Sequence, residues 1–246
     1  MDILGNTIEE ITKVKMGIIK KNRDTIMYEQ DKVTDIIKKE CAEKNNNLHL
    51  LNRNDVQNYS YNNEFQKIDY KNYKNILINL KGKCQIYNAM LCLECINVLR
   101  EKGYNIEEKA IKEGLKTVVH KARFETLNES PKIIFDGGHN ENAIKNLKKM
   151  IEQYYKNDKK IYIISILKTK DYKTAIRLLS EDKDSIFIFT SGNDENRYNS
   201  KEDLFSEAKK YLDKNIYTSD LKNAIKYVRE NCKDEVIMVV RKLLCI

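Results

Sequence analysis

The segment Asp136-Gly137-Gly138-His139-Asn140 combines residue types that bind phosphorylated ligands. It follows an apolar run at residues 132–135 and precedes a helical pattern from about residue 141. A carboxylate at a strand end can accept hydrogen bonds from both ribose hydroxyls, glycines allow close backbone approach, and a helix N-terminus favours anions. Asn140 is suited to cap that helix. An ordinary strand-to-helix turn uses the same residue types, so chemistry alone leaves both interpretations open.

The elements around this segment alternate regularly. Such a βαβ series predicts right-handed crossovers and a doubly wound, mainly parallel, Rossmann-like sheet. The predicted strands are residues 132–135, 161–166, 185–189, 215–217 and 235–240, and the predicted helices are residues 141–155, 171–179, 201–212 and 220–231.

The preceding part of the chain is less regular. A capping box at Thr7-Ile8-Glu9-Glu10 predicts a short helix that ends near Gly17. Strands are expected at residues 25–28, 47–51 and 76–80, a helix from Asp31, and irregular hairpins in the polar stretch 52–73. A long helix at 83–102 and another at 106–118 complete this part. We therefore expect an α/β protein with domains at residues 1–122 and 123–246.

Composition excludes several classes of protein. The 246 residues carry 45 Lys+Arg and 37 Asp+Glu, a net charge of +8 spread along the chain without a basic block, which gives no support for nucleic-acid binding. No apolar run approaches a membrane span and no signal peptide is evident, so we expect no membrane partner and a cytoplasmic location. Cys92 and Cys95 fall within a helical pattern, which favours packing over redox or zinc duty. A nicotinamide dehydrogenase would require Gly-x-Gly-x-x-Gly after a strand, and the sequence has none.

Four collinear segments resemble one family, the folylpolyglutamate synthases of the Mur ligase superfamily. Each is similar to a family motif, in the same order along the chain. The segments are Leu4-Gly5-Asn6-Thr7 with Lys15-Met16-Gly17-Ile18-Ile19-Lys20, Gly82-Lys83-Cys84-Gln85-Ile86-Tyr87-Asn88-Ala89, Arg123-Phe124-Glu125 with Asp136-Gly137-Gly138-His139-Asn140, and Lys168-Thr169-Lys170-Asp171.

The resemblance implies part of a Mur-ligase central, ATP-binding domain followed by a C-terminal glutamate-ligase domain. It also implies a ligase of folate and one-carbon metabolism, in which ATP with Mg²⁺ phosphorylates a folate carboxylate and L-glutamate then displaces phosphate. By the same resemblance, Asn88 contacts adenine, Arg123 the phosphates and Asp136 the ribose. His139 lies near the reacting groups, and Lys15 becomes a carbamate that binds magnesium. A solvated surface lysine is the alternative for Lys15.

The sequence also departs from the family pattern. The phosphate-binding loop Gly-x-x-x-x-Gly-Lys-[Ser/Thr] is absent, since Gly82-Lys83 is followed by Cys84. The family's Pro-Gly-Arg is Lys121-Ala122-Arg123, and its closing Gly-Ser-Leu-Tyr is Arg241-Lys242-Leu243-Leu244. We therefore expect the C-terminal portion of such a ligase, inactive alone, with a separate N-terminal half as a possible partner. A non-catalytic nucleotide-binding remnant or regulatory subunit is the alternative.

Overall fold

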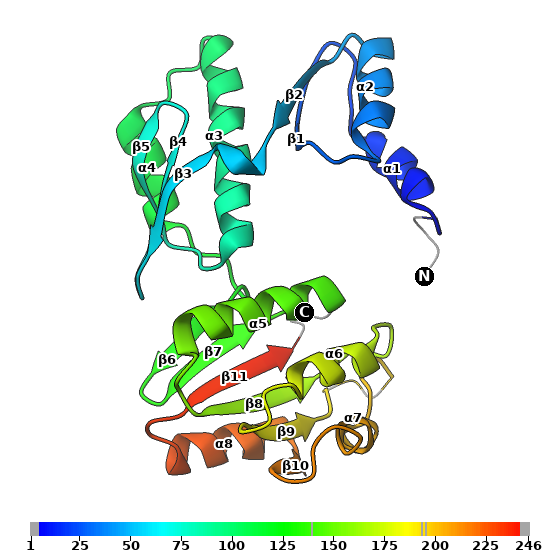
Figure 1. Cartoon of the computed structure of the whole chain (residues 1–246), viewed down its shortest axis with the longest axis vertical. Helices are drawn as coiled ribbons and strands as arrows, with labels where there is room; N and C mark the ends of the chain where they lie inside the picture. The colour runs from blue at the N-terminus through cyan, green and yellow to red at the C-terminus, as the bar shows by residue number, and fades with distance from the viewer. Residues whose placement is uncertain (1–4, 139, 193, 195, 242–246) are drawn as a thin grey trace. The chain divides into compact units, whose positions relative to one another are not determined.

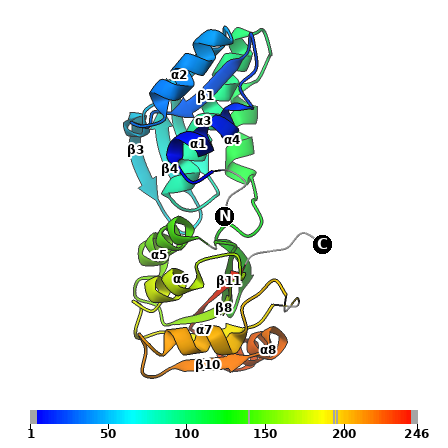
Figure 2. The same cartoon turned by 90° about the vertical axis from the view of Figure 1, so that its right-hand side faces the viewer.

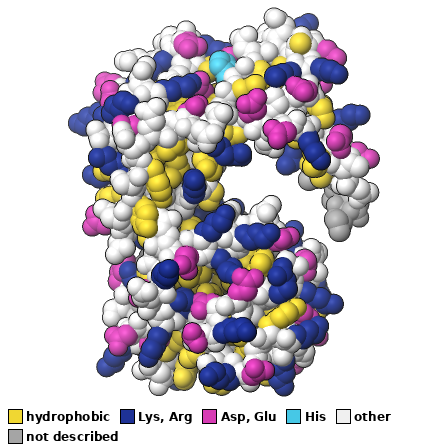
Figure 3. All heavy atoms as spheres, in the orientation of Figure 1, with side chains coloured by type: hydrophobic (Ala, Val, Ile, Leu, Met, Phe, Trp, Pro, Cys, Tyr) yellow, Lys and Arg dark blue, Asp and Glu magenta, His cyan; other side chains and the backbone are white. Residues whose placement is uncertain are grey.

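The computed structural model describes residues 5–138, 140–192, 194 and 196–241. The chain divides into two compact units, one of Met1–Asn79 with Lys83–Val118 and the other of Leu80–Gly82 with Val119–Ile246. The domain boundary at residue 122 stays a prediction. Within the described ranges, no helix has the length and apolar content needed to cross a membrane. Figure 3 shows basic and acidic side chains intermingled over the visible face of each unit.

The first unit opens with two helices and two parallel strands. Thr7 and Glu10 form the predicted capping box, which fixes the start of the first helix. The two strands pair in parallel from Asp24 opposite Asn47. Met16, Ile19 and Cys41 form the small buried cluster beneath the helices. These elements are α1 (Ile8–Met16), β1 (Asp24–Tyr28), α2 (Thr34–Glu43) and β2 (Asn47–Leu51).

The rest of the first unit is an antiparallel sheet with two helices. The polar stretch expected to contain irregular hairpins forms one short 3-10 turn and two strands whose register is interrupted. The long helix α3 buries Ile86, Met90 and Leu93, and Gly103 follows it with a φ of 89°, which suits glycine. The elements are η1 (Arg53–Asp55), β3 (Val56–Tyr61), β4 (Gln66–Tyr70), β5 (Tyr73–Ile78), α3 (Lys83–Glu101) and α4 (Glu108–Thr117).

The second unit is the predicted doubly wound sheet, and the prediction of a mainly parallel α/β fold is confirmed. Its strand order is β10-β9-β8-β11-β7-β6, parallel throughout except for the β6–β7 pair. The strands are β6 (Glu125–Glu129), β7 (Lys132–Asp136), β8 (Lys160–Ser165), β9 (Ile186–Thr190), β10 (Ile216–Ser219) and β11 (Val236–Arg241). The helices are α5 (Glu141–Tyr155), α6 (Tyr172–Leu179), α7 (Lys201–Ala208) and α8 (Leu221–Asn231).

Alternating strand residues build two cores on the two faces of this sheet. Ile134 and Ile164 pack with α5, α6 and α7, whereas Ile133 and Ile163 pack with α8. Figures 1 and 2 show α5 and α6 on one side of the sheet and α8 on the other. Burial on both faces explains why the strands read as continuous apolar runs. Because all strands but β6 run the same way, the carboxyl ends of β7, β8, β9 and β11 lie at one edge of the sheet.

Candidate nucleotide and ligase site

The carboxylate of Asp136 ties two segments together at the end of β7. Its Oδ1 accepts a hydrogen bond from the backbone N–H of Gly138 at 2.7 Å, and its Oδ2 accepts one from that of Phe124 at 3.0 Å. The side chain is buried, with 6% of the residue exposed. Asp136 therefore has a structural role that its place in a sequence motif does not reveal.

The segment before β6 is held in an uncommon backbone conformation. Ala122 and Phe124 have φ values of 59° and 51°, in the left-handed region that L-residues seldom adopt. The Ala122 carbonyl accepts a hydrogen bond from Gly137 N–H at 2.9 Å, and the Ala122 N–H donates to Glu125 Oε2 at 2.7 Å. Such strain costs of order 1–3 kcal/mol per residue and persists only where surrounding contacts enforce it, which is common at ligand sites.

Arg123 stands between these two left-handed residues. Its side chain is exposed and makes no hydrogen bond or ion pair with any described residue. Phe124 anchors the segment by packing in the core, with ring centroids 6.1 Å from those of Tyr154 and Tyr155. Because the backbone is fixed in this way, the binding of an anion would have to order only the Arg123 side chain. The glycine of the family's Pro-Gly-Arg falls on Ala122, and the left-handed φ gives a physical reason for glycine there.

The helix α5, which follows the turn, adds a partial positive charge, the same sign as the charge on Arg123. Asn140 caps α5 by accepting a hydrogen bond from Ala143 N–H at 2.9 Å, as its residue type predicted. The N-terminal end of a helix of this length carries a partial positive charge that favours phosphate or carboxylate. His139, predicted as a catalytic residue, lies outside the described residues, and its role stays a prediction.

Arg241 and Tyr198 contact each other near this edge of the sheet, and neither was predicted as a site residue. Val240 of β11 pairs with Asp136, and the next residue, Arg241, places its guanidinium 5.2 Å from the Tyr198 ring centroid. A Cβ on Gly192 would lie 2.0 Å from that ring, so only glycine admits Tyr198 in this position. The contact between Gly192 and Tyr198 depends on how the loop packs, so it cannot be predicted from a local sequence pattern.

Asn88 and Lys15 belong to the first unit. The Asn88 side chain is exposed on α3 and donates a hydrogen bond to Gln85 Oε1 at 2.9 Å. Lys15 is exposed in the last turn of α1. The two residues share no hydrogen bond, so among the predicted site residues that the structure describes only Arg123 and Asp136 are joined, through Phe124.

The described residues supply no ready-made metal centre. Across them, no group of three or more His, Cys, Asp or Glu side chains is placed to hold an ion. The role of Lys15 as a carbamate that binds magnesium stays a prediction. Cys92 and Cys95 are both exposed on α3, so the prediction that they are packing residues is wrong. Partial desolvation raises the pKa of both thiols, which is unlike a reactive thiolate.

Comparison with known protein families gives a match, which covers most of the second unit. Residues 122–241 match the family model for the Mur ligase, glutamate ligase domain. The part of the chain that is similar to this glutamate ligase domain is therefore the part that forms the doubly wound sheet.

The particular relatives are folylpolyglutamate synthases. The chain is 26% identical to the dihydrofolate synthase/folylpolyglutamate synthase of Bacillus subtilis (strain 168), over 99% of this chain and 57% of the relative. Among solved structures, it matches folylpolyglutamate synthase from Thermotoga maritima with a TM-score of 0.79 and 24% identity, over 96% of this chain and 55% of that one. It matches the ADP complex of the Mycobacterium tuberculosis enzyme with a TM-score of 0.81 and 20% identity, over 98% and 58% of the two chains. The resemblance inferred from four motifs is confirmed, and the chain spans a little over half the length of these relatives.

Proposed function

We propose that this chain is the C-terminal part of an ATP-dependent ligase that adds L-glutamate to the γ-carboxyl of a folate. The observation that carries the proposal is the match of residues 122–241 to a glutamate ligase domain. The tied loops at the end of β7 support it, because they place Arg123 and Asp136 at the edge where parallel sheets bind ligands. The ADP complex of a structural relative supports nucleotide as one ligand.

The geometry gives each second-unit residue a feasible task. Asp136 would accept a ribose hydroxyl beside the backbone N–H groups of Phe124 and Gly138 that it already binds. Arg123 presents its guanidinium fork to phosphate. The first unit would contribute Asn88 to the adenine, and Lys15, as a carbamate, to magnesium. Magnesium would neutralise phosphate charge when bound.

The proposed reaction transfers the γ-phosphoryl group of ATP to the folate γ-carboxylate, which gives an acyl phosphate and ADP. The glutamate amine then attacks the acyl carbon, phosphate leaves and the amine loses a proton. Negative charge accumulates on the transferring group, which is where the Arg123 guanidinium would act. His139 would lie near the reacting groups.

The same sequence argues that these 246 residues do not turn over alone. Phosphoryl transfer depends on clamping the γ-phosphate, and no Gly-x-x-x-x-Gly-Lys-[Ser/Thr] loop is present. An N-terminal half, on this chain or on another, would have to supply it. The second candidate function is a nucleotide-binding or regulatory subunit without catalysis.

Asp136 offers the sharpest test of the nucleotide site. Asp136→Ala should weaken ADP binding by about 1–3 kcal/mol in a calorimetric titration, since it removes a charged hydrogen-bond acceptor. We also expect a lower melting temperature, because Phe124 and Gly138 lose their buried acceptor. Asp136→Asn is the matched control, since it keeps one accepting oxygen and loses the charge.

Three outcomes separate the proposals. Equal ADP affinity of the parent and both Asp136 variants would remove this residue from the site. ADP binding without folate- and glutamate-dependent phosphate release, both alone and with a relative's N-terminal half added, would favour the non-catalytic function. Release by the chain alone, abolished by Arg123→Ala, would contradict the expected need for a second half.

A further inference from the structure

A cavity of the first unit is lined by none of the predicted site residues, although Lys83, Ile86 and Tyr87 belong to the same motif as Asn88. It has a volume of about 250 Å³ and is bounded by η1, β3 and the first turns of α3. This is below the roughly 300–1,000 Å³ of pockets for drug-sized ligands, so it suits one ring system with a charged group. The side chains that matter here are Arg53, Val56, Tyr59, Lys83, Ile86 and Tyr87.

Arg53 is fixed in place with its hydrogen-bond donors unused. Its Cζ lies 4.8 Å from the ring centroid of Tyr28 and 5.4 Å from that of Tyr87. The two tyrosines are themselves locked, because the Tyr28 hydroxyl donates to the Tyr87 carbonyl at 2.7 Å. These cation–π contacts position the guanidinium, and its N–H edge bonds to no other described residue. An edge of this kind is suited to bind carboxylate or phosphate with two parallel hydrogen bonds.

Lys83 supplies a second cation to the same cavity. It is the first residue of the long helix α3, whose N-terminal end adds partial positive charge. Neither Lys83 nor Arg53 forms an ion pair with a described residue, and no carboxylate lines the cavity. Asp55 is in the same 3-10 turn as Arg53 but is not part of the lining.

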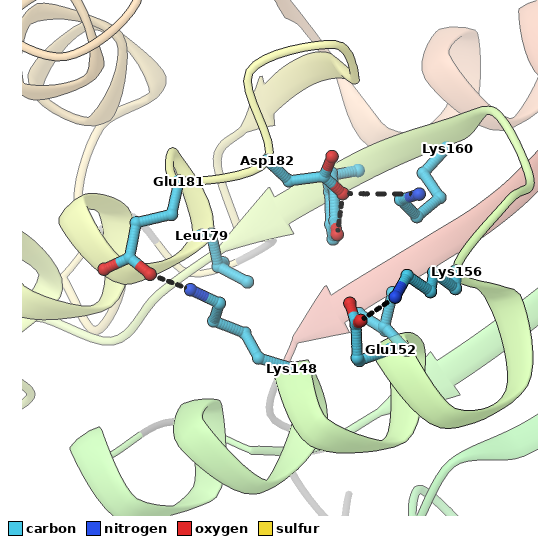
Figure 4. A pocket seen from close by; sticks show the side chains of 9 residues that line it. Lys148, Glu152, Lys156, Lys160, Leu179, Glu181 and Asp182 are labelled. Atoms are coloured by element: carbon cyan, nitrogen blue, oxygen red, sulfur yellow. Dashed lines mark hydrogen bonds and ion pairs between the residues drawn. The ribbon is translucent and has the colours of Figure 1, made fainter.

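A larger cavity in the second unit shows what a charge-balanced pocket looks like. It has a volume of about 320 Å³, lies between α5, α6 and the start of β8, and carries three lysines and three carboxylates. Figure 4 shows each lysine directed at a carboxylate. The pairs are Lys148 with Glu181, Lys156 with Glu152 at 3.2 Å, and Lys160 with Asp182 at 3.7 Å. That cavity has no cation left for a ligand, whereas the first-unit cavity has two.

The remaining walls of the first-unit cavity are aromatic and aliphatic. The hydroxyl of Tyr59 donates to Gln66 Oε1 at 3.2 Å, which fixes one aromatic wall, and Tyr87 forms another. Val56 and Ile86 complete an apolar surface. Planar rings stack on tyrosine faces, while a neighbouring cation selects an anionic substituent.

We infer that this cavity binds a planar aromatic ring that carries a carboxylate or phosphate group. The site is distinct from the proposed adenine contact, because Asn88 does not line it and its amide donates to Gln85. The inference therefore stands whether or not the proposed ligase function is correct.

The test uses the full chain and four small probes in ligand-observed NMR and calorimetric titrations. AMP and 4-aminobenzoate carry both a ring and an anion, whereas adenosine has only the ring and inorganic phosphate only the anion. We expect AMP or 4-aminobenzoate to bind with a Kd of about 1 mM or tighter, and the two half-probes to bind at least about tenfold more weakly. Which of the two binds more tightly identifies the anion as phosphate or carboxylate.

Charge-removing variants locate the binding. Lys83→Gln and Arg53→Gln should each weaken the preferred probe by about tenfold or more, the loss expected for a charge-assisted hydrogen bond. Lys156→Gln, from the charge-balanced cavity, is the matched control and should leave the affinity unchanged. Lys83 is exposed, so its replacement should leave the fold intact, and this variant decides the matter if Arg53→Gln perturbs the edge-to-face contact of Tyr28 and Tyr87.

Several results would overturn the inference. These are no binding of either ring-and-anion probe at about 1 mM, equal affinity for phosphate alone, and equal losses in Lys83→Gln and Lys156→Gln. Loss of AMP binding in Asn88→Ala with none in Lys83→Gln would assign the nucleotide to the proposed ligase site instead.

Discussion

The β1–β2 sheet of the first unit and the six-stranded sheet of the second differ in how they are buried. In β8, five of the six strand residues, Ile161 to Ser165, are buried, and both faces of its sheet are covered by helices. In β1, only Tyr28 is buried, and Ile8, Val14 and Ile18 near it in sequence are 49%, 52% and 80% exposed. Parallel sheets are ordinarily covered on both faces. The second unit thus derives its order from apolar packing, and the start of the first depends more on polar contacts.

One such polar contact joins three elements. Asp24 of β1 accepts hydrogen bonds from Lys102, just after α3, and from His49 of β2, the latter at 3.0 Å. The Asp24 side chain is only 12% exposed. Partial burial of this kind makes an ion pair worth more than the surface median of about 0–1 kcal/mol.

If the two sheets differ in burial as described, the largest loss of unfolding free energy is expected from a core substitution in the second unit. Leu147, fully buried on α5, should lose about 3 kcal/mol of unfolding free energy when replaced by alanine, because the cavity is walled by a packed core. Urea denaturation measures the loss, and hydrogen exchange of α5 and β8 peptides locates it. Lys149→Ala, at an exposed position of the same helix, is the control and should change stability by less than about 0.5 kcal/mol. A loss under about 1 kcal/mol at Leu147 would contradict the picture of a tightly packed second-unit core.

A smaller and pH-dependent effect is expected at Asp24. The hydrogen bonds from Lys102 and then His49 lower the pKa of Asp24 to about 2, below the roughly 3.9 of an unfolded chain. A lowered carboxyl pKa stabilises the fold above the unfolded value, and this stabilisation is lost as the pH falls from about 4 to 2. Asp24→Asn should therefore cost about 1–2 kcal/mol at pH 7 and flatten the acid limb of the stability curve.

The control for this prediction is Asp35→Asn. Asp35 pairs with Lys38 at 3.5 Å, but the Asp35 side chain is 81% exposed, so its replacement should leave the acid limb unchanged. Thermal melts at intervals from pH 2 to pH 7 provide the measurement. An acid limb that is the same in Asp24→Asn and in the parent would show that the bridge does not stabilise the first unit.

Sequence patterns predicted the second unit better than the first for a physical reason. Continuous apolar runs flanked by amphipathic helices are local signals, and every predicted strand and helix after residue 130 is present. The antiparallel strand β6 was not predicted, because Glu125–Glu129 is polar at most positions and pairs at the sheet edge. In the first unit, polar residues 56–61 form β3 through pairing with β4, which a residue pattern alone does not specify.

The candidate site shows the same limit at single residues. The motif around Asp136 was visible, but its hydrogen bond to Phe124 N–H joins residues from two segments and depends on the fold. The left-handed φ values of Ala122 and Phe124 are equally invisible, since neither residue type favours that region. Sequence therefore located the loop, and the structure supplied the reason that the backbone on both sides of Arg123 is held in place.

The smallest expected effect concerns the exposed apolar surface of the first unit. Ile18 is 80% exposed and the adjacent Ile19 is 4% exposed, so the pair offers the same side chain in two environments. Ile18→Ser should change the unfolding free energy by less than about 0.5 kcal/mol, because it removes no burial within this chain. Ile19→Ser should cost several-fold more, since it leaves a void and a hydroxyl among Met16 and Cys41. Urea denaturation at two protein concentrations measures both variants. A loss above about 1 kcal/mol for Ile18→Ser that grows with concentration would mean that another copy of the chain covers this surface, and the contrast between the two sheets would then be one of assembly rather than of packing.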